Sequence, residues 1–135
     1  MNSPTIAALL AGGVLGSAEN SFVIAEWRDE GAPPGPPRWI APLHLHNSDD
    51  ETWYVLEGRL CLKRGDEIVE AGPGAAVLVP RGMPHTYWNP DPAPVRYLLV
   101  MTPKIHQLIE AIHATLDRSP DGMRALFRRY DSALL

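Results

Sequence analysis

Proline is the residue that most constrains the fold of this chain, because 14 of its 135 residues are prolines. Proline fixes φ and has no backbone N–H, so it interrupts helices and sheet interiors and favours turns. At this density we expect many short elements joined by turns, and we do not expect a bundle of long helices. The length is that of one ordinary domain with a core of its own.

Apolar and β-branched segments alternate with turn residues over most of the chain. The predicted strands cover residues 22–27, 39–46, 52–56, 60–63, 67–70, 75–79, 85–89 and 95–101. Short strands separated by turns at close intervals are typical of an antiparallel sandwich or barrel. The sequence therefore predicts an all-β domain.

The apolar pattern changes to a helical period after residue 101. Thr102-Pro103 and Ser119-Pro120 each combine an N-cap residue with a proline in the first helical turn. Two short helices are therefore predicted. We expect residues 1–101 to form the barrel, including an N-terminal strand, and residues 102–135 to form a helical extension that packs on it.

Charge and cysteine content exclude several classes of function. Lys and Arg number 12 and Asp and Glu 16, for a net charge of −4, whereas a nucleic-acid binder needs a dense basic face. The single cysteine, Cys61, excludes an internal disulfide framework and fits a reducing compartment, so we expect a cytoplasmic location. The apolar stretch 6–18 is too short to span a bilayer, and we expect no membrane partner.

Three histidines and one glutamate are spaced so that they can converge inside a β-structure. His44 and His46 are two residues apart, so on a strand both point to the same side. Glu51 begins the next strand and His85 begins a later one. Burying these groups unpaired would be costly, and one divalent transition metal would satisfy all four. Nitrogen and oxygen ligands suit Fe, Mn, Ni, Co, Cu or Zn, and do not choose among them.

Two motifs contain these residues, one over residues 44–58 and one over residues 74–89. Their defining positions are His44, His46, Glu51, Gly58, Gly74, Pro80, Gly82, His85 and Asn89. In these positions the sequence resembles the cupin superfamily, and specifically its small single-domain bacterial members with a quercetinase-like conserved barrel. The resemblance implies a jelly-roll β-barrel, or double-stranded β-helix, with two short C-terminal helices here. It places His44, His46, Glu51 and His85 on the four metal-ligand positions.

Further candidate site residues follow from strand alternation. Tyr87 is two residues after His85 and should face the same interior, where it either donates a hydrogen bond to substrate or packs as part of the wall. Trp53 and Val55 share a face with Glu51 and are predicted to line a substrate pocket with Tyr87. Glu51 and Tyr87 are the candidate catalytic groups.

The resemblance implies a metal-dependent protein that acts on a small organic molecule, most directly a dioxygenase-type oxidoreductase. A metal-dependent isomerase or decarboxylase, and a non-catalytic cupin that binds a metal or small molecule, stay open, because the fold does not choose among them. We also expect a homodimer, since small jelly rolls leave sheet edges exposed and the segment 11–27 is suited to pair across subunits.

Overall fold

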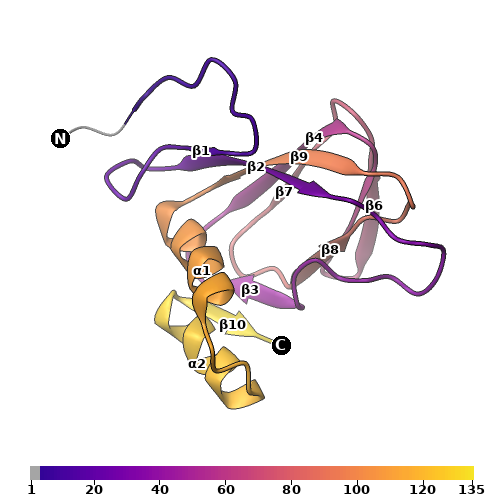
Figure 1. Ribbon diagram of the computed structural model, residues 1–135. Helices are drawn as coiled ribbons and strands as arrows, with labels where there is room; N and C mark the ends of the chain where they lie inside the picture. The colour runs from indigo at the N-terminus through magenta and orange to yellow at the C-terminus, as the bar shows by residue number, and fades with distance from the viewer. Residues whose placement is uncertain (1–3) are drawn as a thin grey trace.

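The computed structural model describes residues 4–135, so the first three residues of the predicted barrel domain lie outside it. Two five-stranded antiparallel sheets face each other, and two helices lie at one end of them (Figure 1). The first sheet has the strand order β1 (Val14–Leu15), β2 (Val23–Asp29), β9 (Val95–Met101), β4 (Glu51–Glu57), β7 (Ala76–Val79). The second has the order β10 (Ser132–Leu134), β3 (His44–His46), β8 (His85–Trp88), β5 (Leu60–Arg64), β6 (Glu67–Ala71). The predicted jelly-roll class is confirmed.

The core lies between the two sheets and follows from strand alternation. Along β9 every second residue is buried, from Val95 to Met101. The same alternation along β4 buries Glu51, Trp53 and Val55 on one face. A fully buried large apolar side chain stabilises the fold by about 1.5–3 kcal/mol. One face of β4 therefore supplies both core packing and a buried carboxylate.

The helices begin at the two predicted capping residues. α1 (Pro103–Ala114) follows Thr102, whose hydroxyl accepts a hydrogen bond from the Ile105 backbone N–H at 3.3 Å. α2 (Pro120–Arg129) follows Ser119 in the same way. Ile105 packs into the main core, and a second small core forms around Leu108, Leu126 and Phe127. No helix within residues 4–135 has the length and apolarity needed to cross a membrane.

The strand β10, which the sequence did not predict, returns the chain from α2 to the second sheet. It pairs with β3, and Ser132 lies opposite His46 in the register. Backbone hydrogen bonds extend the pairing, from Asn47 N–H to the Asp131 carbonyl at 2.9 Å and from Leu135 N–H to the Leu43 carbonyl at 3.0 Å. The C-terminal segment is thus part of the sheet that carries the first two histidines (Figure 1).

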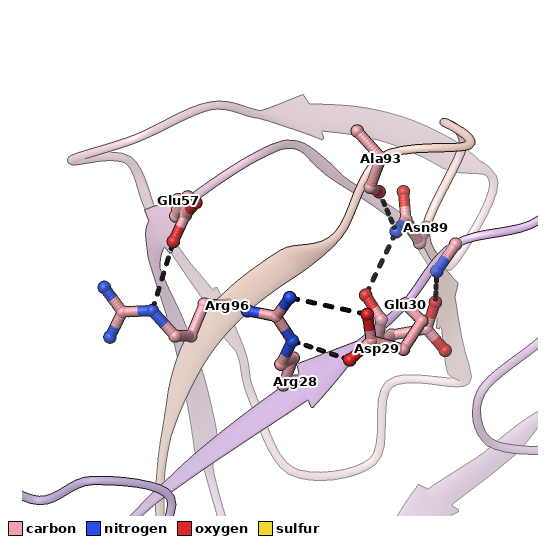
Figure 2. Close-up of polar contacts among 8 residues, drawn as sticks. Arg28, Asp29, Glu30, Glu57, Asn89, Ala93 and Arg96 are labelled. Carbon is pink, nitrogen blue, oxygen red and sulfur yellow. Dashed lines mark hydrogen bonds and ion pairs between the residues drawn. The ribbon is translucent and has the colours of Figure 1, made fainter.

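Polar contacts hold the turns at the other end of the sheets. Arg96 stands near the start of β9, whereas α1 follows the end of that strand. The Arg96 guanidinium donates to Glu57 at 3.3 Å, and the Asn89 amide donates to the Ala93 carbonyl at 2.8 Å (Figure 2). The Arg96 guanidinium also donates to Glu26 at 3.2 Å. Contacts as exposed as these stabilise little. They order the loops far from the helices.

The homodimer is a prediction that the outer sheet surface makes testable. Tyr54 and Leu78 lie on the neighbouring strands β4 and β7, and are 39% and 53% exposed. We expect a dimer in sedimentation at micromolar concentration. If the segment 11–27 pairs across subunits, Val14→Glu on the edge strand β1, at a 43% exposed site, should weaken the dimer, and Leu78→Glu should weaken it only if this outer surface takes part. Ile68→Glu, at a 63% exposed site on β6 of the other sheet, is the matched control. A wild-type monomer at that concentration would contradict the prediction.

Candidate metal centre

Strand pairing brings the three histidines of the two motifs together. His44 and His46 occupy alternate positions of β3, and His85 lies directly opposite His44 on β8. All three side chains are buried. One ring nitrogen from each lies within 4.8 Å of the others. The predicted convergence of these histidines is therefore present, although they are far apart in the sequence.

Glu51 approaches the histidines from the opposite sheet. Its Oε1 atom lies 3.4 Å from His46 Nε2 and 3.2 Å from His85 Nε2. Within residues 4–135 none of these three buried atoms has a hydrogen-bond partner. Buried polar atoms are normally satisfied, and a divalent cation would accept lone pairs from both imidazoles and from the carboxylate at once. The donor set therefore fits a metal, and Glu51 as its fourth ligand stays a prediction.

Backbone carbonyls fix the tautomer of two of the imidazoles. His44 Nδ1 donates to the Pro42 carbonyl at 2.6 Å, and His85 Nδ1 donates to the Met83 carbonyl at 2.9 Å. A carbonyl oxygen can only accept, so in each neutral ring the proton sits on Nδ1. The lone pair on Nε2 is then free to bind a cation.

A serine on β10 performs the same task for His46. Ser132 is 2% exposed, and its Oγ lies 2.7 Å from His46 Nδ1. That hydroxyl donates to the Tyr130 carbonyl at 3.1 Å, so it accepts the proton of His46 Nδ1. All three rings thus present Nε2 to the same point. Sequence analysis missed Ser132, because no local pattern shows that residue 132 lies beside residue 46.

The charge states of the cluster match those that a metal needs. Burial, together with the neighbouring His85 and His46, lowers the pKa of His44 to about 4. Burial alone raises the pKa of Glu51, but attraction of its carboxylate to positive charge at His46 and His85 prevails and lowers it to about 2. A cation bound at the same place would act in the same sense. At neutral pH His44 is therefore uncharged and Glu51 is ionised, the forms in which each can be a ligand.

Polar contacts also join the loops of the two motifs. Asp50 accepts hydrogen bonds from the Arg81 backbone N–H at 2.9 Å and from its guanidinium at 3.1 Å. The Gly82 N–H donates to the His46 carbonyl at 2.7 Å. Asp50, which immediately precedes Glu51, is thus tied to the turn that precedes His85.

An aromatic wall stands beside the cluster, as alternation predicted. The ring centroid of Trp53 lies 5.6 Å from that of His85 and 5.3 Å from that of Tyr87. The Tyr97 hydroxyl donates to the Tyr87 hydroxyl at 3.4 Å. Burial raises the pKa of Tyr87 well above its usual value, so its phenol stays protonated. Val55 is fully buried in the core.

A cavity of about 50 Å³ adjoins the cluster, and we call it the inner cavity. Trp53 and Tyr87 line it, but Val55 is not among its lining residues in the described chain. Its opposite wall comes from the helices, including Phe127, whose ring lies edge-on to His44 with a centroid distance of 5.4 Å. The helical period after residue 101 predicts an apolar helix face, but it does not indicate what that face covers.

The two helical histidines lie apart from this cluster. His106 pairs with Glu110 at 3.3 Å on the surface of α1. His113 lies edge-on to Trp27, with ring centroids 5.9 Å apart. Both therefore act as surface or packing residues.

Comparison with known proteins places this geometry in a family. Residues 36–101 match the family described as "Cupin domain". These residues of the chain form a cupin domain. The matched segment contains all three clustered histidines and Glu51, and it ends before the two helices.

Individual relatives of this cupin have varied descriptions. It is 28% identical to a Salmonella muenchen mannose-1-phosphate guanylyltransferase over 48% of the chain, but this match spans only 13% of that enzyme. A Silicibacter pomeroyi sugar phosphate isomerase from a cupin superfamily is 28% identical, with a TM-score of 0.52, over 62% of this chain and 51% of that one. A Bacteroides fragilis cupin is 10% identical, with a TM-score of 0.59 over 76% and 86% of the two chains, and shows the fold alone.

Ser132 offers a direct test of how this cupin orients His46. Ser132→Ala leaves His46 Nδ1 without its acceptor, and we expect Co²⁺ or Zn²⁺ to bind about ten- to a hundredfold more weakly in chelator competition. Ser132→Thr keeps the hydroxyl and should retain most of the affinity. Ser48→Ala, which removes an exposed hydroxyl bonded to Asp131 at 2.6 Å, is the control. Equal affinity in Ser132→Ala and wild type would contradict the role of Ser132.

The depressed pKa of His44 predicts acid sensitivity of the metal-free cupin. His44 titrates at 6.5 in the unfolded chain and at about 4 in the folded protein, so between these values only the unfolded chain binds the proton. The corresponding stability is complete above about pH 6.5 and is lost as pH falls towards about 4, by up to about 3 kcal/mol. Urea unfolding with a chelator present, at about pH 7 and about pH 5, measures this loss. The loss of unfolding free energy between these two pH values should be smaller in His44→Gln. An equal loss in that variant would refute its assignment to His44.

Proposed function

We propose that this cupin is a metal-dependent enzyme that acts on a small organic molecule. One divalent transition metal would be held by His44, His46, His85 and Glu51. The observation that supports this most is the set of buried Nε2 and Oε1 atoms that point together without hydrogen-bond partners. Four protein ligands leave two positions of a six-coordinate metal free for other molecules, as a catalytic site requires.

The bound metal would polarise an oxygen of the substrate, and this would lower the pKa of that O–H group or of a C–H group next to it. The residues around it have complementary roles. Glu51 is ionised at neutral pH and is the group that can accept a proton from the substrate. Tyr87 keeps its proton and is the group that can donate a hydrogen bond to a substrate oxygen. Trp53 excludes water from the side of His85.

Within this class we propose dioxygenase-type chemistry on an enolic or catecholic compound as the first candidate. It rests on the donor set of three histidines and one glutamate, with positions left for substrate and dioxygen. A metal-dependent isomerase or decarboxylase is the second candidate. The Silicibacter pomeroyi protein described as a sugar phosphate isomerase favours it, through 28% identity over 62% of this chain. A cupin that binds a metal and a ligand without turnover is the third.

Elemental analysis of protein purified without added metal tests the centre itself. We expect close to one divalent metal per chain in wild type and a large loss in His85→Ala, which removes a ligand. His106→Ala removes a surface imidazole of α1 and should keep the metal. A near-zero content in wild type, or an unchanged content in His85→Ala, would refute the proposal.

Oxygen consumption then separates the candidate reactions. Protein loaded with Fe(II), Mn(II) or Ni(II) is mixed with a panel of enolic and catecholic compounds at an oxygen electrode. We expect uptake with at least one compound and none with His85→Ala. Conversion of a compound without oxygen, followed by NMR under anaerobic conditions, would instead support the isomerase or decarboxylase.

A further inference from the structure

A second cavity continues the inner cavity towards the surface. This outer cavity has a volume of about 120 Å³. The two share six wall residues: Ala41, Pro42, Tyr87, Leu99, Ile109 and Ile112. The inner cavity ends at the metal centre, and the outer cavity ends at Trp27 and the exposed residue His113. Together they form one path from solvent to the cluster.

The walls of this path carry little charge. Among the described residues that line the two cavities there is no lysine or arginine, and Glu51 is the single acid. A phosphate group needs cationic or multiple N–H partners when it is buried, and away from the metal this path offers no cation. The lining thus disfavours a sugar phosphate and favours an uncharged ligand.

The size of the path indicates a small ligand. An apolar cavity of about 150 Å³ is known to hold one benzene ring. The outer cavity of about 120 Å³ and the adjoining inner one of about 50 Å³ are on this scale. The volume of the path therefore matches that of a single ring.

Two buried indole N–H groups of residues along the path have no hydrogen-bond acceptor within residues 4–135. Trp27 lines the outer cavity and Trp53 the inner one, and the Nε1 atom of each is buried with no hydrogen-bond partner within residues 4–135. An oxygen atom on an otherwise apolar ligand is the acceptor that such a donor requires.

The element that closes the path is α1. Ile109 and Ile112 lie on its face towards the sheets and line both cavities, while Gln107 of the same helix is exposed. The helix lies outside the matched cupin segment. Part of the wall shared by the two cavities is thus supplied by residues outside the family motifs.

We propose that the two cavities form one binding site for an uncharged single-ring compound with one or two oxygen atoms, and that α1 selects it. The proposal rests on the proposed function only for the end of the site that meets the metal. The body of the site is apolar and binds the ring whether or not a metal is present.

Calorimetric titration with three probes tests the proposal: phenol, toluene and glucose 6-phosphate. We expect phenol to bind wild type, toluene to bind more weakly because it has no oxygen for the indole N–H groups, and glucose 6-phosphate not to bind. Both ring compounds should also bind wild type from which the metal has been removed with a chelator. That arm separates the two proposals, because it tests the ring site without the metal. Failure of both ring compounds to bind, whether or not glucose 6-phosphate binds, would overturn the proposal.

Variants of α1 test whether the ring compounds bind in the two cavities. Ile109→Trp fills the shared wall, and we expect the dissociation constants of phenol and toluene to rise at least about tenfold. Gln107→Trp adds the same ring on the exposed face of the helix and should leave both unchanged. Ile112→Phe is the second filling variant, and circular dichroism confirms that each protein is folded. Unchanged binding in both folded filling variants, or equal loss in Gln107→Trp, would overturn the proposal.

Discussion

The structure depends on a polar cluster that is buried between two apolar sheet faces and cannot satisfy itself. The Nε2 atoms of His46 and His85 both lie within 3.4 Å of Glu51 Oε1, yet none of these three atoms forms a hydrogen bond within the described chain. Each unsatisfied buried group costs on the order of 1–3 kcal/mol, so a fold that keeps three of them together carries a real penalty. The nearby core offsets it, because the same strands bury Trp53 and the alternate residues of β9. A cation that binds all of these atoms would remove the penalty, which is why metal binding and stability are coupled in such a site.

The rest of the molecule holds these atoms in place. Each imidazole donates a hydrogen bond from Nδ1 to one acceptor, which is the Pro42 carbonyl for His44, the Met83 carbonyl for His85 and the Ser132 hydroxyl for His46. The Nε2 lone pair of each ring is therefore available to a cation. The three acceptors come from three different parts of the chain. Two belong to the loops and strand edges of the cupin segment, but Ser132 arrives on β10 after both helices. The C-terminal segment therefore does more than cover the barrel, because the orientation of His46 depends on it.

Local sequence information was enough for much of this architecture, and failed where contacts are long-range. Val95–Met101 was predicted with its observed bounds, and Thr102 and Ser119 were predicted as caps, because alternation and capping are properties of adjacent residues. The segment 39–46 was expected to be a strand throughout, yet the strand covers only His44–His46. Pro42 has no N–H and interrupts the ladder, although the Ile40 N–H before it still donates to the Tyr87 carbonyl at 2.8 Å. β10 was missed because three residues carry almost no periodic signal and gain their strand form from β3. Convergence of the three histidines was predictable from two motifs, whereas the hydrogen bond of Ser132 was not.

The division between motif and extension also explains how one metal scaffold can serve different ligands. The cupin segment supplies the imidazoles, Glu51 and the aromatic wall, which set what chemistry is possible. The face of the site opposite the metal is built by Ile109, Ile112 and Phe127, all outside that segment. Substitutions at Ile109 and Ile112 change the wall of the path directly, because their side chains line both cavities. The metal-binding imidazoles stand on β3 and β8 and are positioned by the register of the sheet. A Silicibacter pomeroyi protein described as a sugar phosphate isomerase is 28% identical over 62% of this chain. The lack of lysine and arginine among the described residues that line the path nevertheless favours an uncharged ligand here.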